Sequence, residues 1–198
     1  MAVDSAVNQQ PLVPCKVEGN RSGSRSVDLA RKQRLDQVEG GKRTFSLLDT
    51  VMAEALYNTE ILRLAASVPY AERLAGPHAS VVRVSSICGS RVTVDVDVDA
   101  DGRVSRFGQE VRACALGQAA AALLGNGVVG RNAGELAAAH TALAGFLRGT
   151  SDTPGDWPGL AVLGPARPHK ARHASILLAF DAAAAAASAA AAGQRQPA

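Results

Sequence analysis

Residues 91–98 read RVTVDVDV, an alternation of valine with a charged or hydroxyl-bearing residue. Side chains along a β-strand point alternately to opposite faces, so this segment predicts a strand with one apolar face and one face in water. Residues 99–102 (DADG) have the composition of a turn, and residues 104–111 return as a second strand. An antiparallel hairpin is therefore the clearest structural feature that the sequence predicts.

A third strand is predicted just before this hairpin, at residues 81–86. Further towards the N-terminus, apolar residues between Leu47 and Val68 recur at the spacing of one or two helices, which Pro69 ends. A small antiparallel sheet has an apolar face to bury, and helices before and after it can provide the cover.

Three helices are predicted after the hairpin. The first covers residues 115–124 and the last covers residues 174 to about 192. The middle one begins at Asn132, where Asn132 and Glu135 fit a capping box. The predicted fold class is therefore α+β, a small three-stranded antiparallel sheet covered on one face by helices.

Composition divides the chain into one domain with two tails. Residues 1–45 are rich in Gly, Ser, Asn, Gln and charge without a sustained period, as in disordered tails. Residues 46–187 carry the periodic apolar pattern and form the predicted domain, whereas residues 188–198 are a low-complexity C-terminal tail. With 198 residues, of which 47% are hydrophobic, the chain is long enough to bury one core.

Charge and composition argue against several classes of function. The net charge of +3 and the 4% of aromatic residues do not make the basic, aromatic-interleaved surface of a nucleic-acid binder. The alanine tract is the only long apolar run, and the N-terminus lacks the order of a secretory signal. We therefore expect no membrane contact and a cytoplasmic location. No Ser-His-Asp or paired-carboxylate arrangement is recognisable, so an enzyme is not expected.

Three side chains of metal-ligand type lie at predicted junctions between elements: Cys88, Cys114 and His173. Cys88 lies in a turn after a strand, and Cys114 precedes a helix whose partial positive end favours a thiolate. His173 lies just before the last helix, and Pro165 and Pro168 are expected to keep the approach to it extended. Cysteine and histidine are ligands of iron, zinc and iron–sulfur clusters.

The same residues also have an ordinary structural interpretation. A cysteine near the start of a helix is often a small buried hydrophobe, and a single histidine is often a surface or capping residue. The sequence has no Cys-x-x-Cys pair, and its three widely spaced cysteines do not form a disulfide framework. Spacing alone therefore leaves a metal site open. We expect no functional role for Cys15 in the N-terminal tail.

Three short segments carry a resemblance to a known family: residues 87–90 (ICGS), 113–115 (ACA) and 172–174 (RHA). They resemble the ligand-bearing segments of the NifU/IscU-type iron–sulfur cluster assembly scaffolds. In that family a first cysteine sits in a Cys-Gly-Asp turn, a second opens a helix and a third precedes the last helix. The long interval between Cys114 and His173 is similar to that of the SufU branch.

The resemblance implies a scaffold rather than an enzyme. It implies that Cys88, Cys114 and His173 bind iron or a transient iron–sulfur cluster, expected to be of the 2Fe–2S type. It also implies a cysteine desulfurase and apo iron–sulfur proteins as partners of a monomer or weak dimer. Ser90 stands where the family has aspartate, and His173 where it has the third cysteine. Ser90 is thus a weak ligand, and histidine cannot carry a persulfide.

These two departures from the family pattern leave other functions open. A site with two cysteines and one histidine carries less negative charge than the family's site and suits zinc. The chain is alternatively a zinc-containing sulfur-transfer partner of a cysteine desulfurase, with Cys88 or Cys114 as the sulfur acceptor. A further alternative is a paralogue that has lost cluster assembly.

Overall fold

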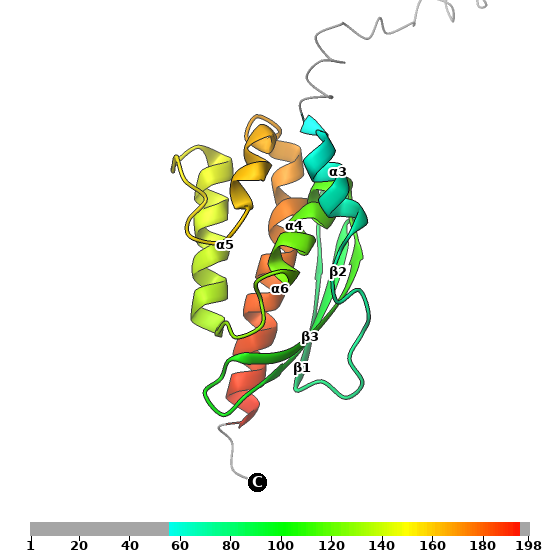
Figure 1. Cartoon of the computed structure of the whole chain (residues 1–198), viewed down its shortest axis with the longest axis vertical. Helices are drawn as coiled ribbons and strands as arrows, with labels where there is room; N and C mark the ends of the chain where they lie inside the picture. Colours follow the sequence, from blue (N-terminus) through cyan, green and yellow to red (C-terminus); the bar gives the residue numbers. More distant parts are fainter. Residues whose placement is uncertain (1–55, 195–198) are drawn as a thin grey trace, which may run out of the picture. The chain divides into compact units, whose positions relative to one another are not determined.

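The computed structural model describes residues 56–194, which form three strands and five helical segments (Figure 1). The predicted tail at residues 1–45 and the N-terminal part of the first predicted helical stretch lie outside the described residues. In chain order the elements are α3 (Thr59–Ala66), β1 (Ala79–Val84), β2 (Arg91–Val98), β3 (Val104–Arg112), α4 (Ala115–Gly125), α5 (Ala133–Arg148), the 3₁₀ helix η2 (Leu160–Ala166) and α6 (Lys170–Gln194).

The sheet is antiparallel with the strand order β1-β2-β3, as the alternating pattern predicts. Val94 of β2 lies between Val81 of β1 and Gln109 of β3. The hairpin between β2 and β3 turns through Gly102, whose φ of 74° lies in the left-handed region that glycine adopts without strain. The predicted fold class, a three-stranded antiparallel sheet with helices, is confirmed.

Helices cover the apolar face of the sheet in two layers (Figure 1). α6 runs along β1 and β2, and α4 lies beside α6. α5 packs on α6, while α3 packs on α4. The four valines of β2, which are 0–3% exposed, form the floor of this core: Val92, Val94, Val96 and Val98. Their burial supplies the hydrophobic stabilisation that the alternating sequence predicts.

α6 is the central helix of the core, and it is longer than the sequence suggested. It begins at Lys170 rather than Ala174 and continues through Gln194, past the expected domain boundary at residue 187. Ala190, in the predicted tail, is 1% exposed. By length and composition alone α6 could cross a membrane, but half of its most apolar stretch is buried inside the fold, as in core helices of globular proteins.

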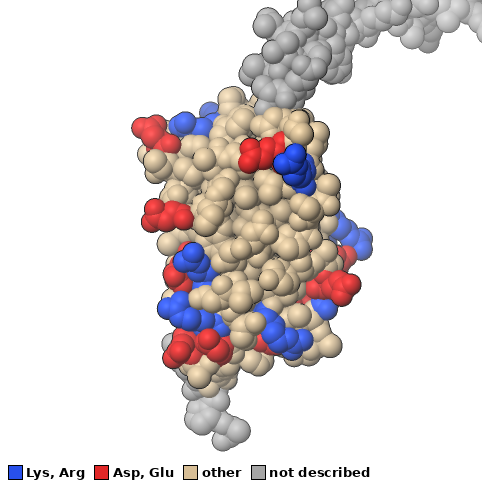
Figure 2. All heavy atoms as spheres, in the orientation of Figure 1, with Lys and Arg blue, Asp and Glu red and all other residues tan. Residues whose placement is uncertain are grey.

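Small residues give α6 and its neighbours closely packed surfaces with few charges. Figure 2, which views the molecule as in Figure 1, shows a broad central area without Lys, Arg, Asp or Glu.

Trp157 in the loop after α5 packs its ring edge-on against Phe180 of α6, with centroids 5.3 Å apart, and donates its Nε1–H to the carbonyl of Leu123 at 3.0 Å. These contacts fix the loop that leads into η2.

The segment before α6 differs from the predicted extended approach. Residues Leu160–Ala166 form the 3₁₀ helix η2, and Pro165 lies inside it. Proline fixes φ near −65°, a value that a 3₁₀ helix also adopts. The two prolines, Pro165 and Pro168, therefore accompany short helical turns instead of extended chain.

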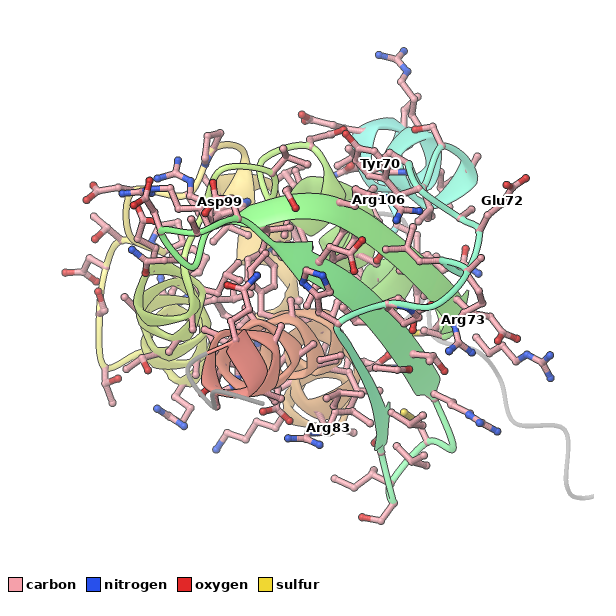
Figure 3. All side chains as sticks on the ribbon, turned by 90° about the horizontal axis from the view of Figure 1, so that it is seen from below. Tyr70, Glu72, Arg73, Arg83, Asp99 and Arg106 are labelled. Atoms are coloured by element: carbon pink, nitrogen blue, oxygen red, sulfur yellow. The ribbon has the colours of Figure 1, made fainter. Side chains whose placement is uncertain are left out.

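The second face of the sheet is also covered, which corrects the prediction that it faces water. Residues 69–78 pass over this face before entering β1, as Figure 3 shows for Tyr70, Glu72 and Arg73. Asp95 is 0% exposed and accepts hydrogen bonds from Arg73 Nη2 at 2.9 Å and from the N–H of Leu74 at 3.0 Å. The alternating aspartates thus bind this segment rather than solvent.

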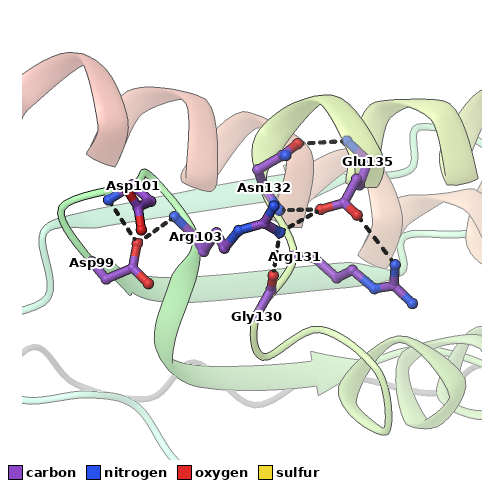
Figure 4. A network of polar contacts seen from close by, with 7 residues as sticks. All are labelled: Asp99, Asp101, Arg103, Gly130, Arg131, Asn132 and Glu135. Atoms are coloured by element: carbon purple, nitrogen blue, oxygen red, sulfur yellow. Dashed lines mark hydrogen bonds and ion pairs between the residues drawn. The ribbon is translucent and has the colours of Figure 1, made fainter.

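A polar network joins the hairpin to the start of α5 (Figure 4). The predicted capping box is present: Asn132 Oδ1 accepts from the N–H of Glu135 at 2.9 Å, and Glu135 accepts from the N–H of Asn132 at 2.9 Å. Arg103 and Arg131 each contact the Glu135 carboxylate at 3.2 Å. The hydrogen bond to Asn132 is the largest of the contacts that lower the pKa of Glu135. The network ties β3 to α5.

Candidate thiol site

Cys88 lies at the surface in the turn between β1 and β2. The turn is closed by two backbone hydrogen bonds, from the N–H of Ser85 to the carbonyl of Ser90 at 2.8 Å and from the N–H of Gly89 to the carbonyl of Ser85 at 2.9 Å. Gly89 has a φ of 67°, a conformation that favours glycine. Other residues would be strained in this conformation, which explains why glycine follows the cysteine. The thiol of Cys88 is exposed.

Two serine hydroxyls of this turn surround the thiol of Cys88. Its Sγ lies 3.3 Å from Ser85 Oγ and 3.1 Å from Ser90 Oγ. The hydrogen bond with Ser85, followed by those with Ser90, lowers the pKa of Cys88 from 9.0 to about 7. A substantial fraction of Cys88 is therefore thiolate at neutral pH, the form that binds metals and attacks sulfur.

Cys114 is the N-cap residue of α4, directly after β3. Its backbone is extended, with φ −65° and ψ 165°, and its side chain makes no capping hydrogen bond. The thiol instead lies 3.4 Å from the hydroxyl of Ser175 on α6. As predicted, Cys88 and Cys114 both lie at junctions between elements.

Ser175 joins the two cysteine positions. It is 0% exposed, and its Oγ lies 3.0 Å from Ser90 Oγ as well as 3.4 Å from Cys114 Sγ. A continuous chain of side-chain contacts therefore runs from Cys88 through Ser90 and Ser175 to Cys114. The turn, α4 and α6 each contribute to this chain, which we call the thiol site.

His173 lies within the first turn of α6 and is held by backbone rather than by the thiols. Its Nε2 lies 3.1 Å from the carbonyl oxygens of both Ala166 and Arg167. Carbonyls only accept hydrogen bonds, so Nε2 carries a proton in this arrangement. Within residues 56–194 no group of three or more His, Cys, Asp or Glu is gathered as a metal site. The ligand role of His173 stays a prediction.

Sequence reasoning missed Ser85 and Ser175. Serine is common and carries no ligand signature, and Ser175 is far from both cysteines in the chain. One signal was present but unreadable without the fold: Gly117 on α4, where a Cβ would lie 2.5 Å from Ser175 Oγ and 3.0 Å from the Ser175 carbonyl. A glycine there allows α6 to approach α4 closely enough for Ser175 to reach Cys114.

The thiol site offers two sulfur donors and two hydroxyls, one thiol being exposed and readily ionised. Thiolates are the preferred ligands of iron–sulfur clusters and of zinc, and an exposed thiolate is also a nucleophile. A cluster or a structural zinc takes four protein ligands. The thiol site supplies two thiols of such a set, so a cluster or a zinc ion bound there would need further ligands.

Comparison with known proteins identifies the class of fold and then the family. No protein-family model and no curated protein matches the sequence. Among solved structures, the N-terminal part of a nitrogen-fixing NifU-like protein from Brucella abortus is 39% identical, with a TM-score of 0.66, and the match covers 70% of this chain and 96% of that chain. This chain therefore belongs to the family of NifU-like N-terminal domains, as its cysteine segments suggested.

Two further structures share the fold at lower identity. A putative iron–sulfur cluster assembly scaffold protein for the SUF system from Fervidobacterium islandicum AW-1 is 15% identical with a TM-score of 0.63, and the match covers 68% of this chain and 98% of that one. A hypothetical protein is 19% identical with a TM-score of 0.60, with the same coverage of 68% and 98%. At these identities the likeness concerns the fold alone.

Proposed function

We propose that this protein is an assembly scaffold that holds iron or an iron–sulfur cluster as cargo on Cys88 and Cys114 and passes it to apo-proteins. The observation that carries the proposal is the thiol site, in which two cysteines from separate elements are joined through Ser90 and Ser175. Membership of the NifU-like family supports the proposal, as does the scaffold description of the SUF-system structure with the same fold.

The protein's own contribution to this function is to present the thiols. Cys88 lies on an exposed turn, where cargo can enter and leave, while Cys114 lies at the start of α4, where the helix end favours bound negative charge. Sulfide or a further ligand must complete the coordination of iron. We expect the protein to act as a carrier without catalysis, in the cytoplasm, with a cysteine desulfurase and apo iron–sulfur proteins as partners.

Anaerobic reconstitution tests this function directly. The protein is mixed with ferrous iron and sulfide, desalted, and examined for the visible absorption of a 2Fe–2S cluster and for bound iron. We expect cluster absorption from the parent protein and a loss of at least tenfold in Cys88→Ala and in Cys114→Ala. Cys15→Ser, outside the described residues, is the matched control and should leave the absorption unchanged.

Two results would reject the scaffold function. One is the absence of cluster absorption and of bound iron in the parent protein after anaerobic reconstitution. The other is cluster absorption that persists in Cys88→Ala/Cys114→Ala. Adding His173→Gln to the set tests the remaining predicted ligand: a loss of iron comparable to that of Cys88→Ala would assign His173 a ligand role, whereas unchanged loading would leave it a structural residue.

The lowered pKa of Cys88 favours a second candidate function, sulfur transfer. The Cys88 thiolate would attack the terminal sulfur of a persulfide on a cysteine desulfurase, forming a persulfide on Cys88 and releasing the desulfurase thiolate. If the site also binds zinc, the protein would be a zinc-containing sulfur acceptor. Desulfurase turnover measured with this protein and with Cys88→Ala tests it, because sulfur transfer predicts a stimulation that depends on Cys88.

A further inference from the structure

Ser175 is the side chain of α6 that reaches both halves of the thiol site. Its hydroxyl contacts Ser90 in the cysteine-bearing turn at 3.0 Å and Cys114 on α4 at 3.4 Å. The Cys88 thiol contacts Ser85 and Ser90 inside the turn itself, at 3.3 Å and 3.1 Å. Among the described residues, Ser175 is therefore the side chain of the helical layer that hydrogen-bonds to this turn, through Ser90 at 3.0 Å and also through Cys88.

The position of Ser175 is built into the packing of α6. The residue is 0% exposed, so its hydroxyl has no access to solvent and depends on Ser90 and Cys114 for its hydrogen bonds. Gly117 leaves the space that the hydroxyl occupies, since a Cβ there would lie 2.5 Å from Ser175 Oγ. Two residues earlier, His173 holds the first turn of α6 against the carbonyls that end η2.

We propose that Ser175 is the positioning residue of the thiol site: its buried hydroxyl joins Ser90 to Cys114 and thereby sets the separation of the Cys88 and Cys114 sulfurs. Within residues 56–194, the side-chain hydrogen bonds between this turn and α6 run through Ser175. α6 thus holds the two thiols, which lie on separate elements, close enough to bind one ligand together. Ser175 makes no contact with cargo in this role.

The inference rests on the proposed function only in that two nearby thiols are what a scaffold needs. Its test requires no iron, so the positioning role and the cargo function can fail independently. The test uses the full chain carrying Cys15→Ser, which leaves Cys88 and Cys114 as the two thiols. Dibromobimane, a reagent with two thiol-reactive arms, first labels one cysteine and then bridges to a second cysteine only when it lies nearby.

The measured quantity is the fraction of singly labelled protein that goes on to form the Cys88–Cys114 bridge, determined by mass spectrometry. Because it describes the second step alone, this fraction does not depend on how fast Cys88 is first alkylated. We expect the fraction to fall at least threefold in Ser175→Ala. Ser188→Ala, which removes an exposed serine from the same helix, is the matched control and should leave the fraction unchanged.

Ser90→Ala breaks the same contact from the other side and keeps the test valid if Ser175→Ala fails to fold. We expect Ser90→Ala to reduce the bridged fraction by a similar factor, and Ser90→Ala/Ser175→Ala to reduce it no further, because both variants remove one shared link. A folded Ser175→Ala with an unchanged bridged fraction would overturn the proposal. Independent, multiplicative losses in the double variant would overturn it as well.

Discussion

At the scale of single residues, hydroxyl groups around the Cys88 thiol determine how readily it ionises. Ser85 and Ser90 place their oxygens 3.3 Å and 3.1 Å from the sulfur of Cys88. Hydrogen bonds to the charged form of a group favour that form, which is why the pKa of this thiol falls to about 7 although the residue lies at the surface. Ser90, although a weak ligand by its chemistry, therefore helps to lower the pKa of the thiol beside it.

Alkylation of Cys88 should follow this pKa. We expect its rate with iodoacetamide, measured peptide by peptide, to rise with pH through a midpoint near 7, because only the thiolate reacts. Ser85→Ala removes the strongest hydrogen bond to the thiolate, so the midpoint should move up towards 9.0, the ordinary value. Ser86→Ala, an exposed serine of the same turn, should not move it. A midpoint near 9 in the parent protein would contradict the hydrogen-bonded geometry.

Asp95 is a second residue whose role depends on its neighbours. Burial raises the pKa of this carboxyl, but hydrogen bonds from Arg73, Ser80 and the N–H of Leu74 outweigh burial and hold the pKa below its ordinary 3.8. A carboxyl whose pKa is depressed by folding stabilises the native state at pH values above its unfolded pKa. That stabilisation is lost as the pH falls through the folded pKa.

Replacing Asp95 should therefore destabilise the fold at neutral pH. We expect Asp95→Asn to lower the free energy of unfolding by about 2–4 kcal/mol at pH 7, since a buried charged hydrogen-bond network loses one partner. The difference from the parent protein should shrink below pH 3.8, where the unfolded carboxyl takes up a proton. Urea unfolding at several pH values measures both effects, and Asp152→Asn in the exposed loop is a control expected to be neutral.

At the scale of elements, α6 connects most parts of the structure. It packs on the sheet, α4 and α5, and an ion pair of 2.7 Å joins its Asp181 to Arg83 of β1, which is labelled in Figure 3. Its alanines keep the helix thin enough to lie between two layers. The second turn of this helix carries Ser175 into the thiol site, so the packing of α6 and the geometry of the site depend on each other.

Gly117 is where this dependence can be tested. An alanine there would put its Cβ 2.5 Å from Ser175 Oγ and 2.8 Å from Ala113 Cβ, so α4 and α6 must move apart. We expect Gly117→Ala to cost about 1–3 kcal/mol of stability, the range for overpacked cores. Gly193→Ala, at a position with nothing within 4 Å, should be neutral or slightly stabilising. Thermal unfolding compares the two, and equal effects would contradict the close contact.

At the scale of the whole molecule, the core is complete without any cargo. The valines of β2 and the apolar residues of α4, α5 and α6 form one buried cluster, whereas the thiol of Cys88 lies at the surface. The fold therefore does not depend on a metal for its hydrophobic core, unlike small zinc domains that unfold when the metal is removed. We therefore expect the protein to stay folded whether or not the proposed cargo is bound.

Removal of metal should accordingly leave the protein native. After treatment with a chelator, we expect a cooperative thermal transition and an unchanged far-ultraviolet circular dichroism spectrum at 25 °C. Bound metal should raise the Tm only by the linkage expected for a ligand of the native state. In metal-free protein, Cys88→Ala should change the Tm by less than about 2 °C, as for most exposed positions. A chelated protein without a cooperative transition would contradict this view.

Much of this architecture could be predicted from local patterns. The alternation in residues 91–98 defined the central strand, DADG defined the hairpin, and the pairing of Asn132 with Glu135 defined the start of α5. The resemblance of the cysteine segments identified the family correctly. The junction positions of Cys88 and Cys114 followed from the same patterns, because a turn and a helix start have local signatures.

The remaining features depended on contacts between residues far apart in the chain. Asp95 was expected to face solvent, because its alternation with valine shows only that it points away from the apolar face of the sheet. In the fold, Arg73 and Leu74 cover that second face and donate hydrogen bonds to the Asp95 carboxylate. The start of α6 was misplaced because the prolines before it fit helical turns as well as extended chain.

The sequence by itself therefore determined the sheet, the family and the two thiols, since these have periodic or local signals. Only the tertiary structure decided which side chain of α6 reaches those thiols. His173 has the chemistry of a ligand but turns its Nε2 to the carbonyls of Ala166 and Arg167, while Ser175 lies between Ser90 and Cys114. The physical reason is that the close approach of α6 to Gly117 sets the direction of each side chain, and helix packing is not encoded in spacing along one segment.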